Sequence, residues 1–576
     1  MQTILSRYRY LLADYDSVLA YSLLGIVGGI VSGLVILGFE LLIVQLGAAL
    51  GVGSSGEGFE ALPEWLRFSL PAGGALLLGC AYTALRAEDR ETGIVHVISR
   101  MHSHYSVLPL RNALLQFFAG AFALATGQSG GREGPGVHRG GAANSLLGQW
   151  FELPHNSLRV LIACGTAGGI AAAFQTPLAG AIFAMEVIVA EYTLVGFIPV
   201  MLAAVSAAAV SGLFSPEGVL FSLPELQRAT LAELPLIIVL GLLCGLAVAA
   251  YVRLTALVAT SLHWPVIVRF TLAGCFTGLL GMQVPEILGI GYDTLQLTLQ
   301  GELLFFTLLT IALCKLLATA VCCGVGMPIG LIAPTLLIGA SLGGMMGIVS
   351  AQLHPDLAAD PTLYIVLGMG AAMGAVLNAP LAALLAIMEL TQTISISMGA
   401  MLAIVIATLT NSGLFRQRSA HQTLLHQLRR VVHEDPVNQL LHSSNVTATM
   451  DSRVVRVPAE LDEEGFQTLL GSAPAWCLIE RDGKDLYLVD GTELLQWIKT
   501  KGFSEETLDV TDADMRRLTT ASVPMQASLR QALDAMREET REAVCVYEHS
   551  ARTGKPLLQG VVTRESIEKF SLRGLQ

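Results

Sequence analysis

The stretch GTAGGIAAAFQTPLAGAIFAME, from Gly165 to Glu186, decides the fold because a second copy of it follows later in the chain. GMGAAMGAVLNAPLAALLAIME, from Gly368 to Glu389, matches it at a constant offset of 203 residues. Both copies carry Pro-Leu-Ala within an Ala/Gly-rich apolar run and end on Met-Glu. Two low-complexity helices could share such features by chance, but the paired Pro-Leu-Ala and Met-Glu favour a duplicated membrane domain.

Apolar stretches recur from Ser17 to about Leu414, and they predict an all-α polytopic membrane domain. They cover residues 18–50, 68–86, 109–126, 158–212, 233–260, 265–283, 303–322, 329–352, 362–389 and 394–414. Several are far longer than the ~20 residues that cross the hydrocarbon, and Gly and Pro interrupt them. We therefore expect stretches that hold two helices, and helices broken at mid-membrane, around a buried polar pathway.

The distribution of charge divides the chain into a membrane part and a soluble part. Of the 576 residues 14% are Asp, Glu, Lys or Arg, and half of these, 40, lie in the last 146 positions. The remaining 430 positions are too poor in charge for a large soluble enzyme, and the length excludes a single compact domain. The net charge of −12 argues against a nucleic-acid partner. Nine cysteines without a Cys-x-x-Cys pair indicate neither a metal site nor a disulfide framework.

Charges at the two ends of the membrane domain predict its orientation. Residues 1–16 carry two Arg and two Asp and lack a cleavage site, so we expect an amphipathic helix at the cytoplasmic surface. Arg416, Arg418, Arg429 and Arg430 follow the last apolar stretch, which places that end in the cytoplasm by the positive-inside tendency. We take residues 17–430 as the transmembrane domain, and we expect the tail that follows to be cytoplasmic.

The soluble tail shows one order of elements twice. Residues 446–500 alternate strand-like and helix-like segments, RVVRVP, DEEGFQTLLGS, AWCLIER, DLYLVD and TELLQWIK. Residues 518–574 repeat that order with SVPMQA, SLRQALDAMREE, AVCVYEH, LLQGVVT and RESIEKF. This pattern predicts a pair of small α/β modules joined by an acidic linker.

The strongest local signal for chemistry is GQSGGREGPGVHRGGAANSLLGQW, from Gly127 to Trp150. Glycines let the backbone approach a ligand, and a helix that begins near Gly134 would direct free N–H groups at an anion. A carboxylate and a guanidinium at membrane depth are costly, so Arg132 and Glu133 are functional candidates. The alternative is an aqueous surface loop that holds an ordinary ion pair.

These motifs resemble those of the CLC family of chloride channels and chloride/proton antiporters. GREGP at Gly131–Pro135, GLIAP at Gly330–Pro334 and the two Pro-Leu-Ala repeats carry the resemblance in letters, order and spacing. The tail resembles the pair of CBS domains (cystathionine-β-synthase type) that many members carry. The resemblance implies a homodimer in a bacterial inner membrane, in which each subunit has its own pore between two inverted halves of broken helices.

The resemblance also assigns roles along the anion pathway. Glu133 matches the gating glutamate, whose carboxylate occupies the outer anion site until it is protonated. Leu331 and Ile332 match the positions whose N–H groups face the central anion. The serine motif of the family corresponds to Glu91-Thr92-Gly93-Ile94-Val95, which keeps a hydroxyl on Thr92 but lacks the first Gly and the Pro. The pore tyrosine is absent; His421 is the nearest alignment, and Ser419 is the second.

Two further sets of residues are expected from the resemblance. The inner proton glutamate of the antiporters aligns with Val187, which cannot titrate. Its neighbours Glu186 and Glu191 are therefore the candidates for a proton path. The repeat partner of Glu186, Glu389, favours a structural role for Glu186 instead. In the CBS-like modules an adenine nucleotide would contact the residues after a strand, which here are Asp490, Glu493, Thr563 and Ser566. A purely structural tail is the alternative, and no cofactor is required for transport.

The resulting prediction is a chloride/proton antiporter with Glu133 as gate and proton carrier. A passive chloride channel is the second hypothesis, because Val187 and the missing tyrosine affect the proton path and the inner gate. A membrane enzyme is the third, and no His-Glu-x-x-His, Gly-x-Ser-x-Gly or paired membrane Asp supports it. We therefore predict no catalytic residues, and chloride, protons and the lipid bilayer as partners.

Overall fold

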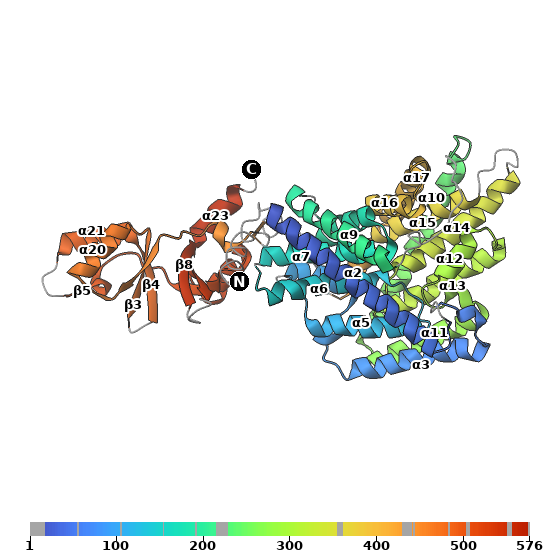
Figure 1. The fold of residues 1–576 in the computed structure, drawn as a ribbon, viewed down its shortest axis with the longest axis horizontal. Helices are drawn as coiled ribbons and strands as arrows, with labels where there is room; N and C mark the ends of the chain where they lie inside the picture. Colours follow the sequence, from blue (N-terminus) through green and yellow to red (C-terminus); the bar gives the residue numbers. More distant parts are fainter. Residues whose placement is uncertain are drawn as a thin grey trace. The chain divides into compact units, whose positions relative to one another are not determined.

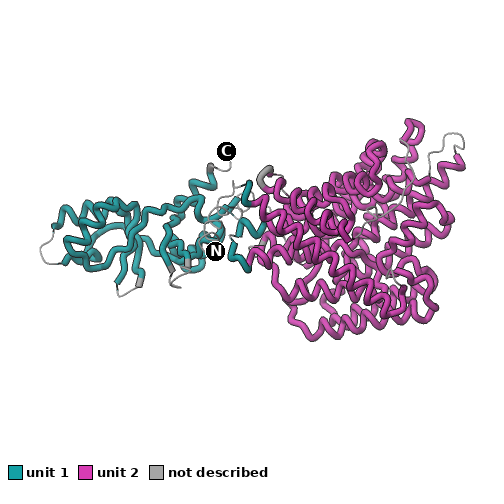
Figure 2. The backbone as a smooth tube through the Cα atoms, in the orientation of Figure 1, with its two compact units in different colours: residues 1–20, 150–159, 433–576 teal, residues 21–149, 160–432 magenta. Residues whose placement is uncertain are grey.

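The computed structural model divides into two compact units (Figures 1 and 2). The membrane unit comprises residues 21–149 and 160–432, and the tail unit comprises residues 1–20, 150–159 and 433–576. The structure describes residues 18–53, 57–103, 106–153, 155–190, 193–214, 229–353, 361–428, 440–441, 444–481, 484–502, 507–549 and 556–573. The amphipathic helix predicted for residues 1–16 therefore lies outside the described residues.

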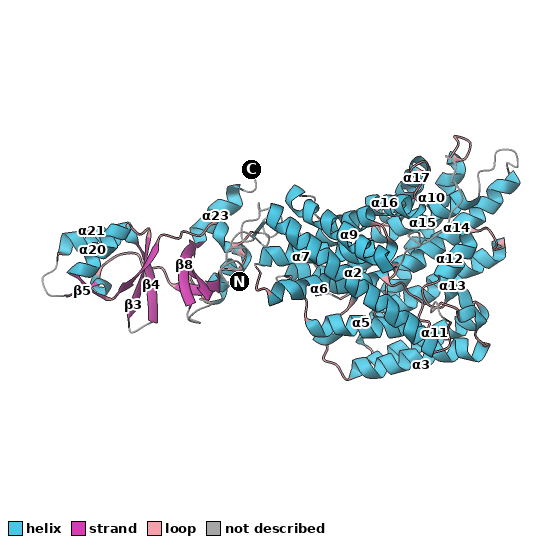
Figure 3. Ribbon diagram, viewed as in Figure 1, coloured by secondary structure: helices cyan, strands magenta, loops and turns pink. Residues whose placement is uncertain are grey.

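Helices build the membrane unit, and strands occur in the tail unit (Figure 3). The first half contains α2 (Val18–Ala49), α3 (Glu64–Thr83), α4 (Gly93–Ser103), α5 (Leu110–Ala125), α6 (Glu133–Trp150), α7 (His155–Phe174), α8 (Pro177–Phe183) and α9 (Leu194–Phe214). The second half contains α10 (Leu234–Ala259), α11 (Val266–Gln283), α12 (Tyr292–Leu299), α13 (Phe305–Gly324), α14 (Ile332–Leu353), α15 (Pro361–Leu377), α16 (Pro380–Thr391), α17 (Ser397–Thr408) and α18 (Ala420–Gln427). The predicted all-α membrane fold is confirmed.

Helices of unequal length explain why the apolar stretches did not divide evenly into spans. Among the described residues, eight helices are long and apolar enough to cross a membrane, and α5, α15 and α16 are shorter. The predicted stretch 362–389 contains both α15 and α16, with the break at Asn378 and Ala379. The expectation that long stretches hold two helices is therefore confirmed.

The two copies of the repeat share the same backbone break. Gln175 and Asn378 adopt left-handed φ values of 58° and 54°, and they are 203 residues apart, like the sequence match. Each is followed two residues later by the proline that opens the next helix, Pro177 or Pro380, in the first turn where a missing N–H costs nothing. Identical geometry at equivalent positions supports duplication over chance resemblance.

Each half also caps a helix of the other half. The Glu389 carboxylate accepts hydrogen bonds from the amides of Leu178 (2.9 Å) and Ala179 (2.7 Å) at the start of α8. The Glu186 carboxylate accepts one from Ala382 (2.8 Å) at the start of α16. The first N–H groups of a helix lack partners within the helix, and a carboxylate satisfies them and complements the helix dipole.

The tail unit contains two three-stranded sheets of the same topology. In the first module β1 (Val454–Pro458) pairs in parallel with β3 (Trp476–Arg481), and β3 pairs antiparallel with β4 (Lys484–Asp490). In the second, β6 (Thr520–Pro524), β7 (Ala543–His549) and β8 (Pro556–Thr563) repeat this order. The remaining elements are the short strands β2 (Glu460–Asp462) and β5 (Thr507–Asp509) and the helices α20 (Glu463–Ser472), α21 (Gly491–Lys501), α22 (Leu529–Glu538) and α23 (Arg564–Arg573).

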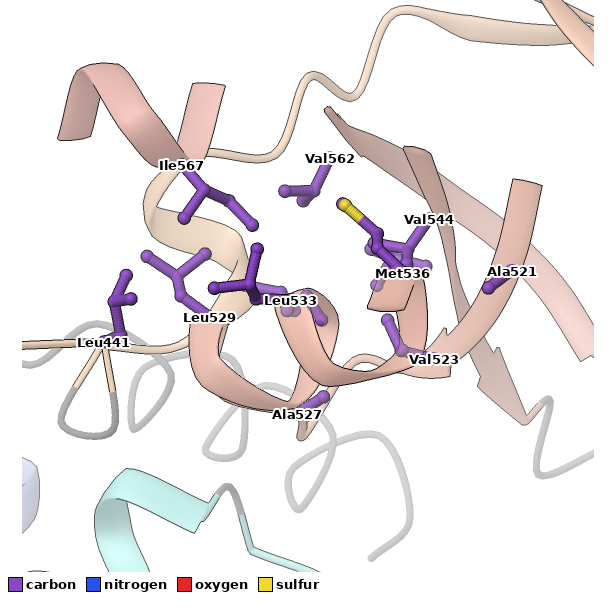
Figure 4. Close-up of a cluster of buried hydrophobic side chains, with 13 residues drawn as sticks. Leu441, Ala521, Val523, Ala527, Leu529, Leu533, Met536, Val544, Val562 and Ile567 are labelled. Carbon is purple, nitrogen blue, oxygen red and sulfur yellow. The ribbon is translucent and has the colours of Figure 1, made fainter. Parts of the chain in front are cut away.

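The modules have separate cores and share a third cluster. Figure 4 shows the core of the second module, where Leu529, Leu533 and Met536 of α22 face Val544 and Val562 of the sheet. The shared cluster packs strand residues of one sheet against those of the other. Its buried members are Leu478, Leu488, Leu518, Ala543, Cys545 and Val561. This shared apolar surface joins the predicted modules into one folded body.

A hydrogen bond network also links the modules. The Tyr547 hydroxyl of β7 donates to Asp485 of β4 at 2.5 Å, and Arg456 of β1 lies 3.5 Å from the same carboxylate. Burial raises the pKa of Tyr547 well above its usual value, so its hydroxyl keeps its proton and remains a donor through the physiological range.

The reciprocal caps predict equal stability losses in the two halves. Glu186→Ala and Glu389→Ala should each lower the free energy of unfolding by about 1 to 2 kcal/mol, because each exposes helix-start amides without a partner. The measurement is thermal unfolding of the detergent-solubilised protein, with Glu302→Ala, an exposed carboxylate, as the matched control. A loss for one glutamate and none for the other would contradict equivalent caps.

Candidate anion pathway

The GREGP and GLIAP motifs, which carry the resemblance, meet within the membrane unit. The amide of Gly131 donates to the Gly330 carbonyl at 2.8 Å, and the amide of Gly330 donates to the Gly131 carbonyl at 2.7 Å. Helices α6 and α14 begin two residues after this bridge, at Glu133 and Ile332. The bridge therefore fixes the starts of two broken helices, one from each half, against each other.

Glycine is required where the two backbones touch. A Cβ added at Gly134 would lie 2.8 Å from the Gly330 Cα, and one added at Gly330 would lie 2.6 Å from the Gly134 nitrogen. Such distances fall inside van der Waals contact, so any other residue would separate the helix starts. The glycine-rich composition of this region follows from that close approach.

The Glu133 side chain occupies the space between the helix starts. It is fully buried, which excludes the alternative of an ion pair in a surface loop. Its Oε2 accepts a hydrogen bond from the Ala333 amide of α14 at 3.3 Å, and its Oε1 accepts one from the Tyr292 hydroxyl at 2.7 Å. The N-terminus of a helix carries a partial positive charge and attracts anions. The carboxylate thus fills a site whose chemistry suits a halide equally well.

A cavity of about 530 Å³ lies beside this point and contains most of the predicted anion-binding residues. Its lining includes Thr92, Gly93, Ile94, Gly134, Leu331 and His421. They come from the starts of α4, α6 and α18 and from the residue before α14, so helix N-termini converge on one space. Ile332 is fully buried in the first turn of α14.

The start of α18 distinguishes the two candidates for the missing tyrosine. The Ser419 hydroxyl caps α18 by accepting a hydrogen bond from the Gln422 amide at 3.2 Å. His421 lines the cavity and is 4% exposed, and its Nδ1 has no hydrogen bond partner among the described residues. His421 therefore faces the cavity, whereas Ser419 caps the helix.

The incomplete serine motif still begins a helix at the cavity. Gly93 opens α4 with a left-handed φ of 77°, which explains why a glycine stands there. Its amide donates to Gln116 at 2.7 Å, so this N–H is engaged within the protein. Thr92 lies in the cavity wall beside it.

Arg132 is held by other parts of the protein. Its guanidinium forms an ion pair with Glu40 of α2 at 2.9 Å and donates to the Ala173 carbonyl at 2.9 Å. It also lies over the Tyr292 ring, 5.1 Å from the ring centroid. This geometry ties α2 and α7 to the GREGP loop, and the anion-binding role predicted for Arg132 gains no support from it.

The structure describes Glu186 and Val187 at the expected position of the inner proton path. Glu186 is the helix cap described above, and Val187 is a half-buried apolar residue in the π-helical turn Ala184–Val189. Glu191 lies outside the described residues.

Three further polar residues of this region were not predicted from the sequence. They are Tyr292, which contacts the Glu133 carboxylate, Lys315, and Glu57. Lys315 of α13 is fully buried and donates to the carbonyls of Ile287 (3.0 Å) and Gly289 (3.0 Å), just before α12. A single lysine within the apolar stretch 303–322 was a detectable signal. Tyr292 and Glu57 carry no comparable signal, because their contacts come from distant parts of the chain.

The predicted nucleotide residues stand at two helix starts in the tail unit. Asp490 accepts hydrogen bonds from the amides of Thr492 (2.8 Å) and Glu493 (3.1 Å) and caps α21. The Thr563 hydroxyl accepts one from the Ser566 amide at 3.2 Å beside α23. No group of three or more His, Cys, Asp or Glu residues in the described part of the chain could hold a metal ion.

The membrane unit is similar to known proteins in sequence. The voltage gated chloride channel family matches residues 73–412. A ClcB-like protein of Ralstonia nicotianae is 32% identical over 360 residues, which are 61% of this chain and 83% of that relative. The H(+)/Cl(-) exchange transporter ClcA of Vibrio cholerae serotype O1 is 30% identical over 382 residues, which are 64% of this chain and 81% of that relative.

Solved structures share the fold. A slow cyanobacterial Cl-/H+ antiporter aligns with a TM-score of 0.63 at 23% identity, over 71% of this chain and 97% of that protein. A eukaryotic CLC transporter aligns with a TM-score of 0.57 at 19% identity, over 97% of this chain and 98% of that protein. The family match spans more than half of the chain and includes both the GREGP and the GLIAP motif. This polytopic membrane protein therefore belongs to the voltage gated chloride channel (CLC) family.

Proposed function

We propose that this protein exchanges chloride for protons across the membrane and that Glu133 is both its gate and its proton carrier. One observation carries the proposal: a fully buried carboxylate occupies a pocket of hydrogen bond donors at the start of α14, beside a cavity. The exchange transporter relatives and the antiporter neighbour support it by similarity.

The chemistry follows from competition for the same donors. Deprotonated Glu133 carries its own negative charge into the pocket and excludes chloride. When a proton binds the carboxylate, the charge disappears and the hydrogen bonds to it weaken, since charge-assisted bonds are about twice as strong as neutral ones. Chloride then takes the vacated donors, and the proton leaves with the displaced side chain. Each cycle therefore links one protonation of Glu133 to anion movement.

The cavity supplies the inner part of the anion route. We propose that chloride enters past His421 and Thr92 and reaches the backbone N–H groups of Leu331 and Ile332. Helix N-termini attract an anion without a fixed cation, so the ion is held and can still leave. His421 would replace the pore tyrosine of the family as the donor at the inner end.

A passive chloride channel is the second candidate, and a specific observation favours it. Val187 cannot carry a proton, and Glu186, its titratable neighbour, is engaged as a helix cap. A route for protons from the cytoplasmic side must therefore use other residues if antiport occurs. The family contains both mechanisms, and flux measurements separate them.

The cellular context is part of the same proposal. We propose a homodimer in a bacterial inner membrane, with the tail unit in the cytoplasm. The arginines that follow α17 support this orientation. We infer that the protein acts by transport and not as an enzyme, and that transport needs no cofactor.

The tail unit is proposed to be a pair of CBS modules. Their repeated topology and shared core support this assignment. An adenine nucleotide contacting Asp490, Glu493, Thr563 and Ser566 remains a prediction, and a structural tail without ligand is the alternative.

The gate prediction concerns Glu133→Gln in liposomes that contain the purified protein. We expect chloride flux to persist but proton movement and pH dependence to disappear, because glutamine fills similar space and carries no titratable charge. Paired chloride and proton electrodes measure both fluxes under a chloride gradient. Glu302→Gln, an exposed carboxylate, is the control and should behave as wild type. Stoichiometric proton pumping by Glu133→Gln would show that another residue carries the proton.

The cavity prediction concerns Thr92→Val and His421→Leu. Each removes one polar group from the anion route, so chloride should bind about 5 to 10 times more weakly, as expected for one lost hydrogen bond. Isothermal titration with chloride measures the affinity. Thr310→Val, whose hydroxyl bonds the Phe306 carbonyl on an exposed face of α13, is the control. Unchanged affinity in both cavity variants would place the anion elsewhere.

A further inference from the structure

We propose that Tyr292 is a positioning residue of the gate. Its hydroxyl donates a hydrogen bond that holds deprotonated Glu133 in its pocket, and it donates to the halide instead when the Glu133 side chain leaves. This inference rests on the proposed gating role of Glu133. It adds a side-chain donor to a site otherwise made by backbone amides.

The two oxygens of the carboxylate have separate donors. The Tyr292 hydroxyl binds Oε1 at 2.7 Å, and the Ala333 amide binds Oε2 at 3.3 Å. The shorter contact is the tyrosine, and it comes from α12, which belongs to the opposite half of the repeat from Glu133. A hydrogen bond to an ionised acceptor favours the ionised form. Tyr292 therefore stabilises the shut state of the gate.

The backbone around Tyr292 is held by its neighbours. Gly291, the residue before α12, adopts a left-handed φ of 87°. The Glu57 carboxylate caps the helix by accepting hydrogen bonds from the amides of Tyr292 (3.0 Å) and Asp293 (3.3 Å). Lys315 holds the preceding turn through the carbonyls described above. The hydroxyl position is thus set before any anion arrives, so little reorganisation is needed to bind one.

The ring of Tyr292 is also held in place. The Arg132 guanidinium lies over one part of it at 5.1 Å, and Phe174 meets it edge-on with centroids 6.5 Å apart. An aromatic side chain with these neighbours has little freedom to rotate. When Glu133 leaves, the hydroxyl consequently remains at the pocket and faces whatever replaces the carboxylate.

Other charged groups surround the pocket without replacing the tyrosine. These groups act electrostatically on Glu133, Tyr292 or Arg132. They are Arg132 just before α6, Arg139 of α6, Lys315 of α13, Glu40 of α2, and Glu57 before α3. Among the described residues, the side-chain hydrogen bond onto the Glu133 carboxylate comes from Tyr292. Removal of this one hydroxyl leaves all of those charges in place.

The first test is the pH profile of anion flux for Tyr292→Phe in the full-length protein in liposomes. Phenylalanine keeps the ring and its packing but removes the donor, so Glu133 should accept its proton at higher pH. We expect the pH of half-maximal chloride flux to rise by about one unit, a tenfold change that corresponds to one charge-assisted hydrogen bond. An unchanged or lowered midpoint overturns the proposal.

The matched control is Tyr364→Phe. Tyr364 is a fully buried tyrosine of α15 whose hydroxyl accepts a hydrogen bond from Ser350 at 3.1 Å, away from the gate. This variant loses the same group from the same kind of environment, so its midpoint should stay at the wild-type value. An equal shift in both variants would assign the effect to general packing and overturn the proposal.

The second test measures whether the Tyr292 hydroxyl donates a hydrogen bond to bound chloride. Glu133→Ala empties the pocket, and isothermal titration then compares chloride binding in Glu133→Ala and in Glu133→Ala/Tyr292→Phe. We expect the double variant to bind chloride about tenfold more weakly, because the hydroxyl is lost as a ligand. Equal affinities would show that the hydroxyl does not contact the halide.

Different outcomes would overturn the proposed antiport and the proposed role of Tyr292. If wild type moves chloride without protons, antiport is wrong, yet the pH midpoint of chloride flux still reports on Tyr292. If Glu133→Gln abolishes pH dependence while Tyr292→Phe keeps the wild-type midpoint, the gate is right and the role of Tyr292 is wrong.

Discussion

The membrane unit depends on amide groups that a broken helix leaves without partners where water is scarce. Each unsatisfied N–H group at such a start is costly, so every broken helix needs an acceptor from elsewhere. The starts of α8 and α16 receive fixed carboxylates, Glu389 and Glu186, each from the opposite half. The start of α14 receives Glu133, a carboxylate that sits beside a cavity. The same chemistry thus serves as a structural cap at two places, and at the third it carries the proposed exchange between Glu133 and chloride.

Much of this architecture could be predicted from local sequence. The Pro-Leu-Ala repeats located both breaks, because proline and its neighbours restrict the backbone whatever surrounds them. The glycines of GREGP were expected to let the backbone approach a ligand. The structure shows that they also let it approach Gly330 of the GLIAP motif. The alternation of strands and helices in the tail could also be predicted, because apolar residues that repeat every two or 3.6 positions are a local property of the sequence.

The remainder depended on contacts between distant residues, which a single sequence does not reveal. Tyr292 looks like an ordinary helix-start residue until α12 is placed beside α6, 159 positions earlier in the chain. Arg132 seemed suited to an anion, but Glu40 of α2 is its partner. His421 was the first and Ser419 the second candidate for the missing tyrosine. The contacts at the start of α18 show that Ser419 caps the helix and His421 lines the cavity.

The paired hydrogen bonds between Gly131 and Gly330 restrict chain length as well as composition. A single residue, Arg132 or Leu331, separates each bridge position from the first residue of its helix. Inserting or deleting one residue there would rotate the following side chains by about 100° around the helix axis. The carboxylate of Glu133 would then point away from α14 although every motif letter remained. Natural variation in this protein should therefore spare the spacing of these turns even where side chains drift, and length changes should accumulate in the loops at the membrane surfaces.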